Sequence, residues 1–371
     1  MTERKSVVVY GASGYTGKLI AWHLAKAGIP FIAAGRDKAR LEAQMASIPE
    51  LRKGEYECHA VENTVDDLTK LLDGRKIVYN VAGPFMQLAE PVVQAALRSG
   101  CHYLDTTGET DWMLKVRNEY GKQFADADLL LAPASSYMWA AGNIAAEIAL
   151  ETPGVDTLEI LYLADTATSV ASTKSFLRMC TKPQYYLEHG KLTQWPYATP
   201  YDVRVADSSR IYKALPWSGG GESIWYEFDS RVRNCSTLVA FRNQAMFGAV
   251  IDTLLDFEKR YRHLPAAEQE RITNEVGGTL TQQEPAREDP LKCRGVITCF
   301  GRSNTGGVSV VLRGNSPYLQ TAAIAAESCR RILANQLLST GFASSAKAFG
   351  ARSLMGALAT LGYHTWEAQQ V

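Results

Sequence analysis

The sequence predicts an α/β protein with a doubly wound Rossmann parallel sheet and a second α+β domain with a mostly antiparallel sheet. Two patterns carry this prediction. Short, continuously apolar runs alternate with helical patterns through residues 1–135, which is typical of parallel strands covered by helices on both faces. From about residue 136 longer strands dominate and few helical patterns separate them, which indicates an α+β domain.

The first domain is expected to alternate strands and helices in regular steps. The strands are expected at residues 6–11, 31–36, 56–61, 76–85 with the following turn, 101–106 and 129–135. The helices are expected at residues 16–28, 37–47, 63–74, 90–100 and 110–125. Pro91 in a first turn and Gly100 just after a last turn are typical helix boundaries. Right-handed crossovers between such strands make the sheet doubly wound.

The second domain is expected to span residues 136–316. Its main strands are expected at residues 155–164, 230–241, 293–301 and 306–314. The most polar stretch, residues 263–290, is expected to hold a surface helix and a loop. The tail, residues 317–371, has a helical pattern, and we expect it to pack back on the Rossmann domain or to form a dimer interface.

Composition and charge exclude several classes of partner. Lys and Arg together number 39, as do Asp and Glu, so no net field attracts nucleic acid or anionic lipid. The seven cysteines are scattered without a CxxC pair, and the six histidines are far apart, so no metal site is expected. The first residues lack the apolar segment and cleavage site of a signal peptide, so none is expected, and the sequence has no run of 18 apolar residues that would predict a membrane span. We therefore expect a cytoplasmic protein with reduced thiols and no membrane contact.

The stretch "GASGYTG", residues 11–17, follows the first expected strand and predicts a phosphate-binding turn. Gly11 is placed where the strand must turn sharply into a helix. Gly14 allows the backbone to approach a pyrophosphate, and Gly17 allows the helix to pack closely on the sheet. No Gly-Lys-Ser/Thr sequence follows, which excludes a Walker A loop.

The end of the second expected strand selects the cofactor. An NAD site typically has an acidic residue there, for the ribose 2′-hydroxyl, whereas this chain has Arg36. A guanidinium group can bind a 2′-phosphate and stack on adenine, so the sequence favours NADP(H). The next residue, Asp37, is expected to be the N-cap of the following helix.

Two further turns at the same edge of the sheet are candidates for the reacting end of the site. The turn "NVAGPF" contains Gly83 and Pro84, whose backbone is expected to line the cofactor. The stretch "YLDTTGE" places Tyr103, Asp105 and Glu109 near the nicotinamide as candidate catalytic residues. A helix cap or an interdomain hydrogen bond is an equally good interpretation of each of these three side chains.

Taken together, "GASGYTG", "AGR", "VYNVAGPF" and "EPVVQAALRSGCHYLDTTGE" resemble the saccharopine dehydrogenase-like oxidoreductases, a group that includes trans-acting enoyl reductases. The resemblance covers residues 6–112 densely. It implies an NADP(H) site in which Arg36 binds the 2′-phosphate. The residues implied at the pyrophosphate are Gly11, Ser13, Gly14, Tyr15, Thr16 and Gly17, and those implied along the nicotinamide ribose are Ala82, Gly83, Pro84 and Phe85. The substrate does not carry over from the resemblance.

Other dehydrogenase chemistries lack their signatures. None of the 17 tyrosines has a lysine four residues later, as a short-chain dehydrogenase requires. Cys180 is the one cysteine placed as a semialdehyde dehydrogenase nucleophile would be, and a buried core thiol is the better interpretation. Direct hydride transfer to a bound acceptor remains, because it needs little beyond orientation and a proton donor.

The second domain is rich in aromatic residues over residues 184–201 and 219–228. This composition predicts a partly apolar or aromatic substrate pocket, with ordinary core packing as the alternative. His189 is a candidate proton donor, and the glycines at 219–221 are a candidate lid hinge.

The sequence therefore favours an NADPH-dependent reductase that acts on a C=C, C=N or C=O bond of a moderately apolar small molecule. A saccharopine-type amino-acid dehydrogenase is an alternative, with Arg204, Arg210, Arg231 and Arg233 as carboxylate ligands. A non-catalytic NADP(H)-binding sensor or scaffold is a second alternative, and a homodimer is expected from the tail.

Overall fold

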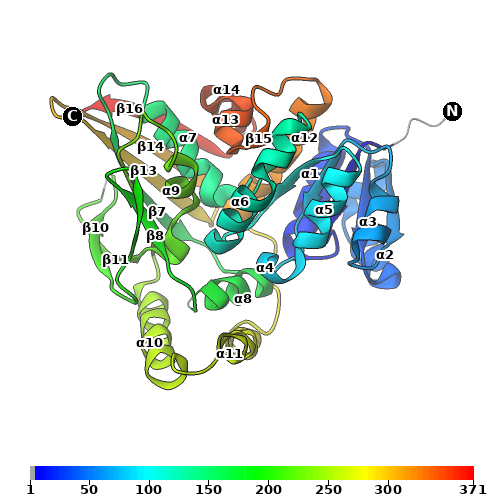
Figure 1. Cartoon of the computed structure of the whole chain (residues 1–371), viewed down its shortest axis with the longest axis horizontal. Helices are drawn as coiled ribbons and strands as arrows, with labels where there is room; N and C mark the ends of the chain where they lie inside the picture. The colour runs from blue at the N-terminus through cyan, green and yellow to red at the C-terminus, as the bar shows by residue number, and fades with distance from the viewer. Residues whose placement is uncertain (1–4, 180, 207) are drawn as a thin grey trace. The chain divides into compact units, whose positions relative to one another are not determined.

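The computed structural model describes residues 5–179, 181–206 and 208–371. These residues fold into two compact units, whose helices and strands are labelled in Figure 1. Unit 1 comprises the chain up to Thr107 together with Asp111–Ala140 and Tyr318–Leu358. Unit 2 comprises Gly108–Thr110, Ala141–Pro317 and Ala359–Val371.

Over the described residues, unit 1 contains a seven-stranded parallel sheet in the order β15-β6-β5-β4-β1-β2-β3. The strands are β1 Val7–Tyr10, β2 Phe31–Gly35, β3 Tyr56–Ala60, β4 Ile77–Asn80, β5 His102–Asp105, β6 Leu130–Ala132 and β15 Gly341–Phe342. The first strand lies between β2 and β4, with Val7 opposite both Phe31 and Ile77. This order is that of the Rossmann fold, extended by β15 from the tail.

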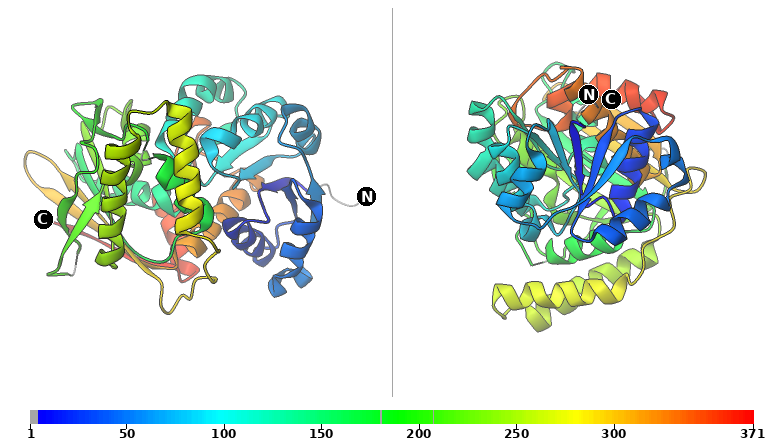
Figure 2. Two further views of the ribbon diagram at one scale, coloured as in Figure 1. Left: turned by 90° about the horizontal axis from the view of Figure 1, so that it is seen from below. Right: turned by 90° about the vertical axis from the view of Figure 1, so that its right-hand side faces the viewer.

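Helices cover both faces of this sheet, as the right-hand view of Figure 2 shows. They are α1 Tyr15–Lys26, α2 Lys38–Ala46, η1 Pro49–Lys53, α3 Val65–Leu72, α4 Phe85–Leu88, α5 Glu90–Arg98, α6 Thr110–Asp126, α12 Pro317–Leu333, α13 Ser345–Phe349 and α14 Ala351–Thr360. On one face, alternate strand residues such as Val8 and Val78 form a core with α3, α5 and α6. All four residues of β1 and of β4 are buried, which is why these strands appear in the sequence as continuous apolar runs.

Unit 2 is built on a mixed sheet of nine described strands, with the main order β10-β11-β12-β7-β13-β14-β16. The strands are β7 Thr157–Asp165, β8 Tyr185–Glu188, β9 Lys191–Gln194, β10 Tyr201–Arg204, β11 Ile211–Leu215, β12 Asn234–Phe241, β13 Arg294–Arg302, β14 Gly307–Asn315 and β16 His364–Gln370. Among these described strands β7 and β12 pair in parallel and every other pair is antiparallel. The predicted fold class is confirmed.

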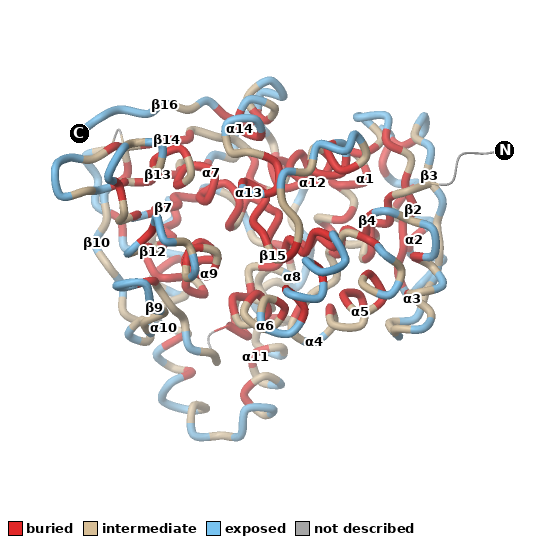
Figure 3. The backbone as a smooth tube through the Cα atoms, turned by 45° about the horizontal axis from the view of Figure 1, so that its top comes forward, coloured by how far each residue is buried: buried red, intermediate tan, exposed pale blue. Residues whose placement is uncertain are grey.

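The helical elements of this unit are α7 Gly142–Ala149, α8 Val170–Met179, η3 Trp217–Gly219, α9 Gly221–Tyr226, α10 Gln244–Tyr261 and α11 Ala266–Leu280, whereas η2 Tyr137–Ala141 belongs to unit 1 except for its last residue. The long helices α10 and α11 lie side by side in the left-hand view of Figure 2. The polar segment at 263–290 does contain a helix, α11, which packs on α8 through the close approach of Gly277 to Lys174. Figure 3 shows buried residues along the central strands, such as β7 and β13, and along α7, whereas the edge strands β10 and β16 are largely exposed or intermediate.

Two features of the chain differ from the sequence prediction. The tail is not wholly helical, because residues 341–342 form β15 and residues 364–370 form β16. The second of these is an edge strand paired with β14, and its outer residues are exposed and polar, so it lacks the apolar pattern of the other strands. The glycines at 219–221 are buried rather than a flexible hinge, since a Cβ on Gly219 would lie 2.7 Å from the backbone of Tyr185.

Candidate functional site

The candidate site lies at the carboxyl ends of β1, β2 and β4. The loop that leaves β1 leads to α1, and the loop that leaves the neighbouring strand β4 leads to α4. Because the strand order reverses between β1 and β4, a crevice is expected at this edge of the sheet. The two loops are in close contact, since a Cβ on Gly11 would lie 2.9 Å from the backbone nitrogen of Ala82.

Two glycines of this turn are required by the packing of the protein itself. Gly11 has a φ of +90°, which disfavours other residues, and its N–H donates to the carbonyl of Ala34 at 2.9 Å. A Cβ on Gly17 would lie 2.5 Å from the carbonyl oxygen of Gly11. The first turn of α1 therefore lies directly against the loop that follows β1, whereas the sequence predicted that Gly17 allows close packing on the sheet itself.

Gly14 has a different environment. The nearest atom to an added Cβ is the carbonyl oxygen of Gly11, at an ordinary contact distance of 3.4 Å, and its φ of −78° suits any residue. Glycine is therefore not needed at position 14 to avoid a clash within the protein. The missing side chain instead leaves space beside the backbone. Directly after it, α1 begins with no capping side chain and no acidic residue in its first turn. Such a helix N-terminus has N–H groups available for an anion.

The neighbouring side chains of the turn frame this space. Ser13 and Thr16 are half-buried, whereas Tyr15 is buried and packs edge-to-face on Tyr318 of α12, with 5.0 Å between ring centroids. These contacts hold the start of α1 in place. An open approach at Gly14 and an uncapped helix start together fit the pyrophosphate of a dinucleotide.

Arg36 follows β2 at the same edge of the sheet. Its side chain is exposed, and it has no hydrogen bond or ion pair with any residue that the structure describes. Burial raises the pKa of Tyr10, the last residue of β1. The positive charge of Arg36 acts to lower this pKa, so the guanidinium group lies near Tyr10 and the loop that follows it. Asp37 is the N-cap of α2, and its Oδ1 accepts from the N–H of Arg40 at 2.9 Å, as predicted.

The turn after β4 is held by Asn80, whose side chain is fully buried. Its Oδ1 accepts from the N–H of Ala82 at 3.0 Å, and its Nδ2 donates to the hydroxyl of Tyr103 at 3.2 Å. Ala82, Gly83 and Pro84 are half-buried. The ring of Phe85 is buried in the hydrophobic core.

Tyr103 and Asp105 are in direct contact, with their side chains fully buried. Asp105 Oδ2 accepts from the hydroxyl of Tyr103 and from Nε1 of Trp112, each at 2.9 Å. Its Oδ1 accepts from the N–H groups of Thr107 at 3.0 Å and Ala134 at 2.8 Å. Burial raises the pKa of Asp105 to about 6 although these four donors act in the opposite direction. The carboxyl group thus ties β5 to α6 and to the chain after β6.

Glu109 has different partners, which belong to α8. Its Oε2 pairs with Nη2 of Arg178 at 2.6 Å, with both side chains fully buried, and its Oε1 accepts from Oγ of Ser175 at 2.7 Å. His189 lies in the exposed turn between β8 and β9, with a φ of +52°. Of the four candidate catalytic residues, the structure therefore joins Tyr103 and Asp105 and gives Glu109 and His189 other surroundings. Cys180 lies outside the described residues.

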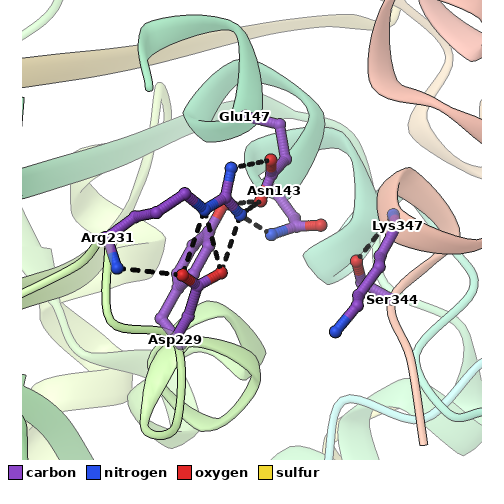
Figure 4. A network of polar contacts seen from close by, with 7 residues as sticks. Asn143, Glu147, Asp229, Arg231, Ser344 and Lys347 are labelled. Carbon is purple, nitrogen blue, oxygen red and sulfur yellow. Dashed lines mark hydrogen bonds and ion pairs between the residues drawn. The ribbon is translucent and has the colours of Figure 1, made fainter. Parts of the chain in front are cut away.

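The aromatic stretches of unit 2 are divided between the core and a pocket. Tyr226 is fully buried, accepts from Nδ2 of Asn143 at 2.9 Å and donates to Oε1 of Glu147 at 2.9 Å. Figure 4 shows Glu147 beside the guanidinium group of Arg231. Glu147 in turn pairs with Arg231, which also pairs with Asp229 at 2.7 Å. Arg231 therefore has protein carboxylates as partners, whereas Arg204, Arg210 and Arg233 are exposed, so their role as carboxylate ligands stays a prediction.

Three residues that the sequence interpretation missed support this region. Asn80 stands at the start of the "NVAGPF" turn, and a polar residue at the end of a buried strand is a signal that could have identified it. No such signal marked Trp112 or Arg178. An aromatic residue in a helix most often packs in the core, and an arginine in a helix most often lies on the surface.

Comparisons with known proteins agree with this geometry. Residues 7–125 match the saccharopine dehydrogenase NADP binding domain, and residues 140–366 match a family of unknown function, DUF5938, over more than half of the chain. The chain belongs to this family. Its first domain is an NADP-binding domain of the saccharopine dehydrogenase type, so the predicted resemblance and the NADP(H) cofactor are confirmed. Relatives that match over this domain include proteins named as saccharopine dehydrogenase-like oxidoreductases.

Individual relatives differ in how much they share with the DUF5938 chain. A lipid droplet localized protein of Caenorhabditis elegans is 28% identical over 192 residues, which are 49% of this chain and 42% of that protein. A trans-acting enoyl reductase of Mycobacterium ulcerans is 22% identical over 373 residues, 87% of each chain. Saccharopine dehydrogenase (L-Glu forming) of Saccharomyces cerevisiae has the same fold, with a TM-score of 0.63, 10% identity and coverage of 99% of this chain and 100% of that one.

Matches to the first relatives are thus partial, since the chain spans less than half of the length of the nematode protein. Within the described part of the chain, no helix is long and apolar enough to cross a lipid bilayer.

Proposed function

We propose that this chain is an NADPH-dependent reductase that adds a hydride to a C=C, C=N or C=O bond of a moderately apolar small molecule. The observation that carries the proposal is the environment of Gly14 and Arg36. An open backbone approach at an uncapped helix start is paired with an exposed arginine that has no ion pair to a described residue. The first suits a pyrophosphate and the second a 2′-phosphate.

Each part of the cofactor has candidate contacts. The turn from Gly11 to Gly17, including Ser13, Tyr15 and Thr16, holds the pyrophosphate, and Arg36 holds the 2′-phosphate. The backbone of residues 82–85 borders the nicotinamide ribose, with Asn80 fixing that turn through the N–H of Ala82. When bound, NADPH supplies the hydride, and the protein orients the acceptor and excludes water.

Tyr103 and Asp105 act in this proposal as positioning residues. Their buried hydrogen bonds run from Asp105 through Tyr103 to Asn80, and from Asn80 to the backbone of the turn. A residue that donates a proton to the substrate must touch the substrate. The carboxyl group of Asp105 and the hydroxyl group of Tyr103 are instead fully buried and hydrogen-bonded within the protein, so we assign neither as that donor. Glu109 has the same burial and a structural partner in Arg178.

The test compares cofactor affinities of two arginine variants. Arg36→Ala is expected to weaken NADPH binding about 10- to 100-fold and NADH binding little, since a charge-assisted contact to phosphate is lost. Arg52→Ala removes another exposed arginine of the same unit and is the matched control. Equal losses for NADPH and NADH, measured by titration of the nicotinamide fluorescence, would contradict the role of Arg36.

The reaction itself is tested by adding the protein to NADPH and a panel of enones, imines and aldehydes. Loss of nicotinamide absorbance with one class of compound supports a reductase and identifies the type of bond that is reduced. Tight NADPH binding without turnover of any class supports the sensor or scaffold instead. The cytoplasmic location and the homodimer stay predictions, for cell fractionation and light scattering to test.

A further inference from the structure

The strand and helix that the tail adds to unit 1 carry an exposed ammonium group. Strand β15 extends the parallel sheet beside β6, with Phe342 opposite Leu131. Because parallel strands end at the same edge of a sheet, the chain leaves β15 at the edge where the loops after β1 and β4 lie. Helix α13 begins at Ser345, shortly after β15, and Lys347 lies in its first turn.

Hydrogen bonds hold the start of α13 at the ends of β5 and β6. Oγ of Ser345 donates to Oγ of Ser135 at 2.9 Å, and the N–H of Ser135 donates to the carbonyl of Asp105 at 2.8 Å. At the other end of the helix, Nη1 of Arg331 donates to the carbonyl of Phe349 at 2.9 Å. The start of α13 is thus fixed at the end of β6, which lies two strands from β4, about 10 Å away at the usual strand spacing.

Lys347 differs from the other residues of α13 because it is exposed, whereas the other four are buried. Its N–H donates to Oγ of the N-cap, Ser344, at 3.2 Å. Side chains of a helix lean toward its N-terminus, and Figure 4 shows the side chain of Lys347 extending past Ser344. The ammonium group therefore lies on the side of the strand ends, and it has no hydrogen bond or ion pair with any residue that the structure describes.

The place of Arg36 decides which end of the cofactor faces this group. The proposed 2′-phosphate contact follows β2, the pyrophosphate turn follows β1, and the turn at residues 82–85 follows β4. These three strands are neighbours in the order β2-β1-β4, and the sheet continues from β4 through β5 and β6. A dinucleotide bound in this direction has its nicotinamide, and the acceptor beside it, on the side of β5, β6 and α13.

The loops at the nicotinamide end provide no exposed proton donor of their own. Residues 81–84, 106–109 and 133–136 follow β4, β5 and β6 and are all described, and their one titratable side chain is that of Glu109. Glu109 is fully buried and paired with Arg178. An acceptor that takes a hydride also needs a proton from a group that touches it, and an exposed ammonium group without a described partner can supply one.

We propose that Lys347 is the catalytic residue that donates this proton, an inference that rests on the proposed reductase function. One carbon of the reduced double bond receives the hydride of NADPH, and the other atom of that bond receives a proton from the ammonium group. The acceptor thereby gains two electrons and two hydrogens, and NADPH becomes NADP⁺. The neutral amine left on Lys347 regains its proton from water, so the lysine is unchanged after each turnover.

Amine acetylation tests the position of Lys347 without any substrate. The whole chain is treated with sulfosuccinimidyl acetate, and the acetylation of each lysine is followed by mass spectrometry of its peptides. Saturating NADPH is expected to slow the acetylation of Lys347 at least about threefold, because a bound ligand fills most of its site. Adenosine 2′,5′-bisphosphate has the 2′-phosphate but no nicotinamide, so it is expected to leave this rate unchanged.

Lys26 is the matched control. It is likewise exposed and without a described partner, but it is the last residue of α1 and lies at the opposite edge of the sheet, before β2. Its acetylation should be the same in every sample. Titration of the nicotinamide fluorescence shows separately whether NADPH binds.

These measurements separate the two proposals. Bound NADPH without protection of Lys347, or equal protection by the bisphosphate, would place Lys347 away from the nicotinamide and overturn its assignment alone. Absence of NADPH binding would overturn the proposed function, and the assignment of Lys347 with it.

Variants test the proton transfer with an acceptor that the parent chain reduces. Lys347→Ala is expected to lower kcat about 100-fold or more, the usual contribution of a general acid, and to bind NADPH as the parent does. Lys26→Ala should keep the kcat of the parent. Ethylammonium can occupy the space left by the lysine side chain and should raise the kcat of Lys347→Ala at least about tenfold, whereas tetramethylammonium has no N–H proton to donate and should not.

A merely structural role of Lys347 would not give a rescue that requires an N–H group. The same kcat of Lys347→Ala with both cations, or an unchanged kcat in this variant, would therefore overturn the donor role. The near-ultraviolet circular dichroism of each variant checks that the fold is kept. A chain that binds NADPH but reduces no compound would overturn the proposed function and the donor role together, and the acetylation rates would still decide where Lys347 lies.

Discussion

Oε2 of Glu109 lies 2.6 Å from Nη2 of Arg178, and neither side chain is exposed to solvent. Glu270 approaches the other side of the guanidinium group at 3.5 Å, and Ser175 donates to Glu109. A charge in this position is stable only with its partner, because burial removes the hydration of both ions.

Removing the arginine alone is therefore expected to be costly. Arg178→Met leaves the carboxylate of Glu109 buried without its counter-ion and should lower the free energy of unfolding by about 3–5 kcal/mol. Replacing both, as Glu109→Leu with Arg178→Met, should cost clearly less than the single change. Urea unfolding at pH 7 measures the difference, with Arg302→Met, which breaks the exposed pair with Glu159, as a control expected to lose less than about 1 kcal/mol.

The three glycines of the cofactor turn should separate into two classes. Gly17→Ala places a Cβ 2.5 Å from the carbonyl oxygen of Gly11, so we expect a loss of about 1–3 kcal/mol of stability or a failure to fold. Gly14→Ala meets no such clash and should keep the melting temperature while weakening NADPH binding at least tenfold. Thermal unfolding and NADPH titration of both variants decide the matter. A Gly14→Ala chain that binds NADPH normally would show that the pyrophosphate lies elsewhere.

Much of unit 1 could be predicted because its signals are local. Continuous apolar strands, helix caps and the glycine spacing are each set within about ten residues, and the structure has the strands in Rossmann order. Strand β16 could not be predicted, because an edge strand with exposed polar residues has no apolar pattern and depends on β14 for its pairing.

The candidate site could likewise be predicted only where local sequence patterns mark its residues. Arg36 and the glycines were found because a cofactor requires these residue types at fixed positions along the chain. Tyr103 and Asp105 were placed at the correct edge of the sheet, but their burial is decided by Trp112 and by the N–H of Ala134, which no local pattern reveals. Arg178 is 69 residues from Glu109 in the sequence, so their pairing depends wholly on the tertiary fold.

Trp112 should matter more at high pH than at low pH. Its indole donates to Asp105, whose pKa is about 6, so the bond is charge-assisted once the carboxyl group ionises. Trp112→Phe is expected to cost about 1 kcal/mol more at pH 8 than the same change costs at pH 5, because a hydrogen bond to a charged group contributes about 1.5–3 kcal/mol and one between neutral groups about 0.5–1.5 kcal/mol. Urea unfolding at both pH values measures it, and Trp225→Phe, whose N–H has no described partner, should show no such pH dependence. Equal costs at the two pH values would contradict ionisation of Asp105 in this range.

A second buried acid gives a pH dependence of the whole fold. Glu222 is fully buried, and its carboxylate accepts from the hydroxyl groups of Tyr162 at 2.7 Å and Thr237 at 3.1 Å. Burial nevertheless raises its pKa from 4.5 to about 7. Because the folded chain binds this proton more tightly than the unfolded chain, the resulting stabilisation is complete below about pH 4.5 and is lost as the pH rises through about 7.

Glu222→Gln removes that titration and retains an amide that fits the same hydrogen bonds. Between pH 4.5 and pH 8 the stability of the variant should therefore rise by about 3 kcal/mol relative to the parent chain, since each tenfold difference in proton affinity between the folded and unfolded chains corresponds to about 1.4 kcal/mol. Urea unfolding at pH 4.5, 6 and 8 tests this, with the exposed Glu188→Gln of the same unit as the control. Parallel stability curves for the Glu222→Gln and parent chains would show that Glu222 does not titrate between these values, because a group with the same proton affinity in both states adds no pH dependence to folding.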